Sequence, residues 1–272
     1  MRNAGLFGLA LLSCLVPPLA RAESPLQTLA NDSWCTDEGD GGGNGVRHCE
    51  VREGAWPAGA STTDVDASPN GGIEVRGWDR PEVRLRAKVV ATAPTEAEAR
   101  DLAGQVQIVT TGKIHATGPR STRGHGWWVS YRLSVPRKAS LTLLSVNGGL
   151  SAYDLSGSLN FETTNGGISL DAVSGNVHGR TTNGGLEIRL AGAGWAGAGL
   201  DLETTNGGVT LALPADYAAH VETGTTNGSM NVDFPVTVQG RIDRKHLAFD
   251  VGKGGAPVRA VTTNGGVVVR KR

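Results

Sequence analysis

The chain has 272 residues, with 40 glycines, 5% aromatic residues and a formal net charge of zero. A neutral chain gives no electrostatic case for binding nucleic acid or an anionic membrane surface. Abundant glycine and few aromatic side chains are typical of a turn-rich β protein with a thin core, rather than a globular enzyme with a large one.

Residues 1–22 are typical of a secretory signal peptide. A basic start precedes an apolar run over residues 6–16, and Ala20-Arg21-Ala22 forms an A-x-A cleavage site. The run is too short for a stable membrane anchor. An alternative is a lipoprotein, because the residues that end at Cys14 resemble a lipobox. We therefore expect export to the periplasm, the outer surface or the medium, with no transmembrane segment in the mature chain.

Residues 23–60 are predicted to form an N-terminal cap or spacer. They hold Cys35 and Cys49, the only two cysteines that follow the signal peptide, and in an exported protein these two are expected to form a disulfide. The loop between them has oxygen ligands that suit Ca²⁺, but it lacks the spacing of an EF-hand. We assign no metal and no cofactor, and we interpret the following side chains as a solvated loop: Asp37, Glu38, Asp40 and Asn44.

Residues 61–146 are predicted to form a less regular β segment with one short helix. Thr95 and Glu98 make a capping box at the start of that helix, and Gly104 can end it. In the strand before it, Arg84, Arg86 and Lys88 fall on one face. Such a stripe can bind anions, but it is more often the solvated face of a half-buried strand, which is our interpretation.

Residues 147–272 are organised around the phrase Thr-Thr-Asn-Gly-Gly and its variants. Successive Asn residues lie 18, 18, 23, 21 and 37 residues apart, and the last step is read as two units with one unmarked turn. A fixed period in this range signals stacked supersecondary units. We predict structural corners at Asn147-Gly148, Asn165-Gly166, Asn183-Gly184, Asn206-Gly207, Asn227-Gly228 and Asn264-Gly265.

Apolar residues recur three and five positions after each Asn, so each unit is predicted to form two short alternating strands. The recurring Thr, Asn and Gly favour an all-β, β-solenoid-like stack of units of about 18–23 residues. The alternative is a β-hairpin meander, because Asn-Gly suits a type I′ turn. We expect φ > 0 at each Gly that follows the Asn, and we expect Arg270-Lys271-Arg272 to blunt the open end of the stack.

Three stretches resemble the DUF4097 family of toast-rack β-repeat proteins, which also carries an adhesin label. They are residues 73–83, residues 135–149 and the Thr-Thr-Asn-Gly-Gly copies, and the likeness covers about residues 61–269. The resemblance implies a bacterial cell-envelope protein with a stacked β-repeat fold. It supplies no catalytic motif, and the Cys35–Cys49 region lies outside the family pattern.

The remaining side chains give little support for catalysis. No histidine has zinc-ligand spacing, and no nucleophile motif or phosphate loop is present. Some solenoids cleave polysaccharides with a pair of acids, but alternation places most acids of the repeats outward among Thr and Arg. These acids are Glu162, Asp171, Glu187, Asp201 and Glu203.

The sequence therefore indicates an exported, non-catalytic cell-envelope protein with a structural, adhesive or sensing role. The alternative is a carbohydrate-active β-solenoid enzyme, a polysaccharide hydrolase or lyase. The expected partners are an envelope glycan, peptidoglycan or another envelope protein, and no nucleic acid.

Overall fold

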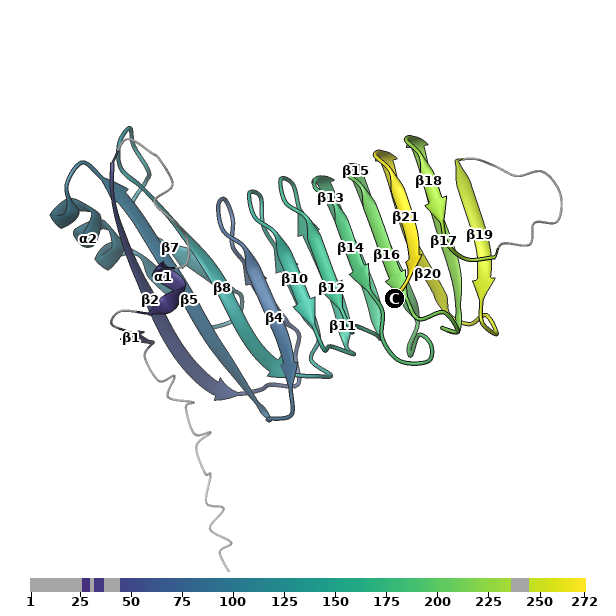
Figure 1. The fold of residues 1–272 in the computed structure, drawn as a ribbon. Coiled ribbons are helices and arrows are strands. Elements are labelled where there is room, and N and C mark those ends of the chain that lie inside the picture. The colour runs from purple at the N-terminus through teal and green to yellow at the C-terminus, as the bar shows by residue number, and fades with distance from the viewer. Residues whose placement is uncertain (1–25, 30–31, 37–44, 236–244) are drawn as a thin grey trace, which may run out of the picture.

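The fold is a long stack of short strands, seen side by side in Figure 1. It was obtained as a computed structural model, and it describes residues 26–29, 32–36, 45–235 and 245–272. The described strands form two sheets of 11 and 10 strands, with the apolar core between them. The predicted signal peptide and the loop from Asp37 to Asn44 lie outside the described residues, so both stay predictions.

The larger sheet, called sheet A, begins with long N-terminal strands and continues into short strands of the repeats. In spatial order its strands are β1 (Gln27–Leu29), β2 (Val46–Pro57), β5 (Glu82–Ala93), β8 (Gly126–Pro136), β4 (Ile73–Trp78), β10 (Leu150–Tyr153), β12 (Ile168–Asp171), β14 (Leu186–Arg189), β16 (Val209–Leu213), β21 (Val267–Lys271) and β18 (Met230–Val232).

The second sheet, called sheet B, runs the length of the stack behind sheet A in Figure 1. In spatial order its strands are β19 (His246–Val251), β17 (Ala219–Asn227), β20 (Pro257–Asn264), β15 (Gly199–Asn206), β13 (Asn176–Asn183), β11 (Ser158–Thr163), β9 (Leu141–Leu144), β3 (Thr63–Asp66), β7 (Ile114–Thr117) and β6 (Gln107–Val109).

The predicted helix is confirmed as α2 (Glu96–Gln105). The Thr95 hydroxyl accepts from the backbone N–H of Glu98, and the Glu98 carboxylate accepts from the backbone N–H of Thr95, which completes the capping box. A second helix, α1 (Ser33–Thr36), has only four residues and was not predicted. Neither of these helices in the described ranges is long and apolar enough to cross a membrane.

The repeats stack as coils, each with one strand in sheet B, an Asn corner and one strand in sheet A. Residues at equivalent positions pair in register, so Leu150 lies beside Ile168, and Ile168 beside Leu186, all in parallel strands. Phe161 pairs with positions in the two neighbouring coils, and not with Leu170 across its own corner. The β-solenoid-like prediction is therefore confirmed, and the hairpin meander is wrong.

The stack begins before the clean repeats. Asn70-Gly71-Gly72, a looser copy of the repeat phrase, joins β3 to β4, and these strands pair in parallel with β9 and β10 of the next coil. The region predicted to be a cap or spacer contains the 12-residue β2, which pairs with β5 along its whole length. The long strands β2, β5 and β8 thus continue sheet A beyond the coils.

The last coil of the sequence is not the last coil of the stack. Strand β20 lies between β15 and β17, and β21 lies between β16 and β18, as the yellow strand among green ones in Figure 1. The prediction that Arg270-Lys271-Arg272 blunts an open end is therefore wrong. Arg272 instead donates from Nη1 to Leu190 O at 3.3 Å and lies 3.6 Å from Asp171.

Among its described residues, the long final step between corners holds no further coil of the same kind. It contains β19, which runs antiparallel to β17 and forms the outer edge of sheet B. The interval between Asn227 and Asn264 is long because it includes β19, which pairs with β17 of the outer coil. The Asn264 coil follows β19 in the sequence, but in the stack it lies on the other side of β17, between the coils of Asn227 and Asn206.

Candidate functional site

The six predicted corners, together with Asn70, are joined by an unbroken ladder of side-chain amides. Each corner Asn except Asn70 donates from Nδ2 to Oδ1 of the Asn in the adjacent coil, at 2.7–2.9 Å, and Asn70 only accepts. The order along the ladder is Asn227, Asn264, Asn206, Asn183, Asn165, Asn147 and Asn70. In the ladder, as in the two sheets, Asn264 lies between Asn227 and Asn206.

A second, inner row of hydroxyls lies beside the ladder. The first Thr of each Thr-Thr pair is buried, and it donates to the carbonyl of the first corner Gly of the adjacent coil at 2.7–2.9 Å. Thr181, for example, donates to Gly166 O at 2.7 Å. Ser145 takes this place in the coil of Asn147. The inner hydroxyls therefore satisfy carbonyls that would otherwise be buried without a partner.

The expected backbone conformation at the corners is wrong for five of the six glycines. Of the Gly residues that follow the predicted corner Asn, only Gly265 has a φ in the positive region, at 156°. Gly is required for a different reason, which is close approach. A Cβ on Gly184 would lie well under 3.0 Å from the carbonyl of Gly166 and 2.7 Å from the Gly167 nitrogen. The stacking of the coils thus excludes a side chain at this position.

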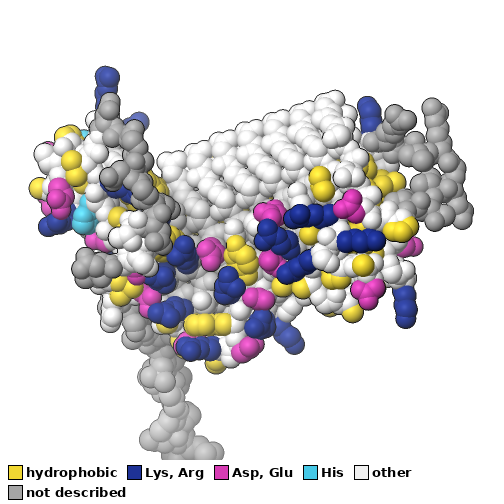
Figure 2. Space-filling model, viewed as in Figure 1, with side chains coloured by type: hydrophobic (Ala, Val, Ile, Leu, Met, Phe, Trp, Pro, Cys, Tyr) yellow, Lys and Arg dark blue, Asp and Glu magenta, His cyan; other side chains and the backbone are white. Residues whose placement is uncertain are grey.

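The second Thr of each pair and the ladder Asn point outward and form a regular surface, which we call the polar corner face. Figure 2 shows it as a smooth white area, while the charged side chains gather on the neighbouring surface. In the part of the chain that the structure describes, the hydroxyls of these outer threonines make no side-chain hydrogen bond. Its exposed residues are Thr164, Asn165, Thr182, Asn183, Thr205, Asn206, Thr263, Asn264, Thr226 and Asn227.

The outer side of sheet B carries two of the predicted acids on one shared guanidinium. Arg259 Nη1 donates to Asp201 at 2.5 Å and to Glu203 at 2.7 Å, beside a shallow hollow of about 260 Å³ that Glu162 also lines. Burial would lower the pKa of Arg259, but these two hydrogen bonds raise it above its ordinary value. The two acids are close enough for a glycosidase pair, whose carboxyls lie within about 9.5 Å.

The surroundings of that pair do not suit a general acid. Such an acid must donate a proton to the leaving oxygen, whereas both carboxylates of this pair already accept hydrogen bonds from Arg259 Nη1. Asp171 lies apart from this pair near Arg272, and Glu187 pairs with Arg189 on its own strand. The structure therefore brings Glu162, Asp201 and Glu203 together, and it separates the other two acids from them.

No group of three or more His, Cys, Asp or Glu side chains among the described residues is arranged to hold a metal ion. The predicted oxygen-rich loop lies outside those residues. His220 and His246 each contact one carboxylate, Asp250 at 2.7 Å and Glu222 at 2.9 Å. Both pairs belong to the contacts between β17 and β19, so they hold the outer strand of the stack.

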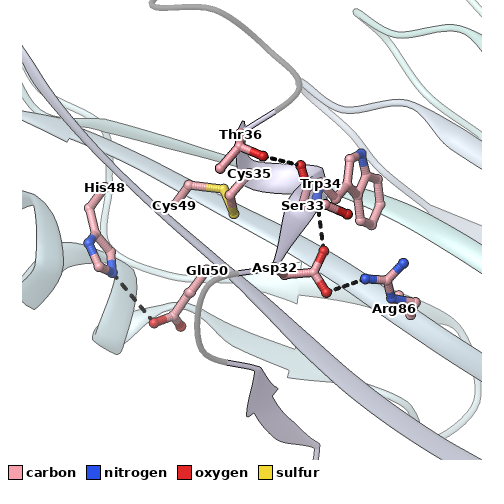
Figure 3. Close-up of a disulfide and its surroundings, with 9 residues drawn as sticks. All are labelled: Asp32, Ser33, Trp34, Cys35, Thr36, His48, Cys49, Glu50 and Arg86. Atoms are coloured by element: carbon pink, nitrogen blue, oxygen red, sulfur yellow. Dashed lines mark hydrogen bonds and ion pairs between the residues drawn. A yellow bond between two sulfur atoms is a disulfide. The ribbon is translucent and has the colours of Figure 1, made fainter.

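The Cys35–Cys49 disulfide is present and ties α1 to β2, with the two Cα atoms 5.7 Å apart (Figure 3). Next to it, Trp34 is 6% exposed and covers the predicted basic stripe. The ring centroid lies 5.1 Å from Lys88 Nζ and 4.1 Å from Arg132 Cζ, in cation–π contact. Arg86 pairs with Asp32 (Figure 3). The interpretation of this stripe as a solvated face is wrong at Lys88, which is only 1% exposed, whereas Arg84 is exposed.

The sequence did not predict that Trp34 packs over Lys88, because no periodicity links Trp34 to β5. The one available signal is its place next to Cys35, since a disulfide anchors the neighbouring residue as well. The Asp32 carboxylate fixes the same turn by accepting from the backbone N–H of Trp34 at 2.9 Å.

We expect the Cys35→Ala/Cys49→Ala double variant to lose about 3 kcal/mol of unfolding free energy, because the bond closes a short loop in the unfolded chain. Urea denaturation of the variant and of the parent protein measures this loss. Parent protein kept in reductant is the control and should show the same loss. Equal stability of oxidised parent and variant would contradict the prediction.

Comparison with solved structures finds chains of similar length from bacterial proteins. One is described as a "putative cell adhesion protein" from Clostridium sporogenes, with 14% identity, a TM-score of 0.39, and coverage of 82% of this chain and 100% of that one. Another is a "putative adhesin" from Bacteroides fragilis, with 10% identity, a TM-score of 0.37, and coverage of 82% and 97%. No curated protein matches the chain.

The family comparison concerns the coils themselves. Residues 138–270 match the model of the family described as Toastrack DUF4097. The match begins just before β9 and ends within β21, so it contains all six predicted corners. With their parallel coils and Asn ladder, residues 138–270 of this chain belong to the Toastrack DUF4097 family.

Proposed function

We propose that this protein is an exported, non-catalytic component of the bacterial cell envelope that adheres through the polar corner face to an uncharged glycan. The observation that carries the proposal is the difference between the two threonine rows. The inner hydroxyls bond to the backbone and stabilise the stack. The outer hydroxyls of the described coils bond to no side chain, so they do not contribute to the stack in this way.

The chemistry of the face favours a neutral, hydroxyl-rich polymer. Each hydroxyl can donate and accept a hydrogen bond, and adjacent parallel strands repeat this pair about every 4.8 Å. Because the face is formed from Thr and Asn, it offers no charge to attract an ionic partner. The rigid coils also hold the side chains in place, which lowers the entropy lost on binding. A glycan of the envelope fits these properties better than a charged partner.

We expect Thr182→Arg to weaken retention on an insoluble neutral glycan by about tenfold or more, which corresponds to about 1.4 kcal/mol. Thr182 lies near the middle of the polar corner face, and a long charged side chain there would hold a flat polymer away from its neighbours. Co-sedimentation with cellulose, chitin and a neutral envelope polysaccharide measures the retention.

The matched control is Ser158→Arg, which places the same side chain at an exposed position of β11, away from the face. It should bind as the parent protein does. Retention of none of these glycans by the parent protein would overturn the adhesive proposal. Equal retention of both variants would show that another surface binds.

The same samples test the alternative of a carbohydrate-active enzyme. The Asp201 and Glu203 pair is the arrangement that would favour it. We expect no soluble sugar to be released from the glycans by the parent protein. A release that Glu203→Gln abolishes without unfolding would replace the adhesive proposal with an enzymatic one.

A further inference from the structure

A separate cavity of about 390 Å³ lies at the end of the ladder where the coils meet the long strands of sheet A. It is formed by the turn that follows β3, the loop between β7 and β8, and the first half of β8. Its volume lies within the range of small-molecule pockets. None of its lining was predicted as a site, because the three segments are far apart in the sequence.

Tyr131 is the most informative residue of the cavity. It lines the cavity, it is 1% exposed, and its hydroxyl is buried without a hydrogen-bond partner. Burial raises its pKa above the ordinary value, with a further contribution from the charge of Asp66, so the hydroxyl keeps its proton at neutral pH. A buried donor without a partner costs about 1–3 kcal/mol. A ligand that accepts from Tyr131 would recover this free energy.

Other polar groups complement this donor. Burial would raise the pKa of Asp66, but bonds from Lys113 and Ser68 lower it, so the carboxylate is an acceptor. Asn70 is the last member of the ladder: it accepts from Asn147 at 2.9 Å, and its own amide donates to no described residue. The residues that carry these donors and this acceptor thus line one small cavity, as in sites that recognise hydroxyl groups.

One wall of the cavity is aromatic and fixed in place. The indole of Trp127 lines it and donates from Nε1 to Pro119 O at 2.7 Å. Gly118 allows the ring to lie against the loop, since a Cβ there would meet the ring at 2.9 Å. An indole face of this kind packs against the C–H face of a sugar ring, whose rim carries the hydroxyls.

The charges of the lining favour a neutral ligand. The lining holds one acid, Asp66, and one base, Arg120, so it favours neither sign of ligand charge, and Asp66 already pairs with Lys113 at 2.8 Å. We propose that the cavity binds one neutral sugar ring, at the end of a glycan that lies along the polar corner face. The proposal deepens the proposed function, because Asn70 belongs to both the cavity and the ladder.

Titration calorimetry with neutral monosaccharides and tetrasaccharides of glucose, galactose, mannose and N-acetylglucosamine tests the cavity. We expect at least one free sugar to bind, and Tyr131→Phe to weaken it by about fivefold to tenfold, the equivalent of one hydrogen bond. Because the hydroxyl has no partner within the described chain, Tyr131→Phe should not lower the melting temperature. The matched control is Tyr217→Phe, at a buried tyrosine outside the cavity, which should bind as the parent does.

The two proposals fail in different ways. If the cavity inference is right, Thr182→Arg leaves the affinity for free monosaccharides unchanged, since Thr182 lies outside the cavity. No binding of any free sugar, or equal binding by Tyr131→Phe, would overturn the cavity inference and leave the adhesive face intact. Binding of free sugar by a protein that retains no insoluble glycan would support the cavity and overturn the adhesive face.

Discussion

Gly184→Ala is expected to lower the free energy of unfolding by about 3 kcal/mol, the upper part of the usual range for overpacking. The new Cβ would lie well under 3.0 Å from the carbonyl of Gly166 and 2.7 Å from the nitrogen of Gly167. These are backbone atoms of the adjacent coil, so they cannot rotate away as a side chain would. Separating the coils would instead weaken the ladder bonds on both sides of Asn183. Chemical denaturation followed by circular dichroism measures the loss.

The matched control is Gly149→Ala, at the second glycine of another corner. There a Cβ would meet its nearest atom, the carbonyl oxygen of Gly167, at an ordinary 3.6 Å. We expect the change in unfolding free energy to stay within about 0.5 kcal/mol, as for most surface substitutions. Equal losses for the two variants would contradict the close-approach explanation and point to backbone entropy instead.

Deletion of residues 257–272 is expected to release the outer coil, although that coil comes earlier in the sequence. The deletion removes β20 and β21, which are the parallel neighbours that join β17 and β18 to the rest of the stack. In a stacked repeat, each coil is stabilised chiefly by its neighbours. Amide exchange in residues 219–227 should therefore become about 100-fold faster, equivalent to about 2.7 kcal/mol.

Hydrogen exchange read by mass spectrometry measures this effect coil by coil. Residues 158–163, four coils further in, should keep their protection and serve as the internal reference. Val268→Ala, at an exposed side chain of β21, is the control for a change in that strand and should leave the outer coil protected. A deletion variant in which residues 219–227 stay protected would mean that coils stack in their order of sequence.

The chemistry of one coil is local, and the sequence therefore determined it. The Asn-Gly corners, the apolar residues three positions later and the capping box of Thr95 and Glu98 each depend on residues a few positions apart. The recurrence of the same Thr, Asn and Gly in each unit favoured parallel stacking over a hairpin meander, because identical residues such as Asn165 and Asn183 gain hydrogen bonds only when coils lie in register.

The tertiary structure decided which coils are neighbours. The corners at Asn206, Asn227 and Asn264 have nearly the same chemistry, so each ladder amide can accept or donate to any of the others. No local residue pattern distinguishes a stack in the order of the sequence from the observed stack, in which the Asn264 coil lies between the coils of Asn206 and Asn227. The observed order depends on β19, whose antiparallel pairing with β17 occupies the outer edge and leaves the inner place to β20.

The candidate sites divide in the same way: the part built from a local repeated pattern was predicted, and the part built from distant segments was not. The polar corner face follows from a repeated phrase, so its residues could be named in advance. The cavity requires Asp66, Asn70, Trp127 and Tyr131 to meet, and the burial of Lys88 requires Trp34 to cross onto β5. These contacts join residues with no shared period, and they exist only because the two sheets and the N-terminal segment pack together.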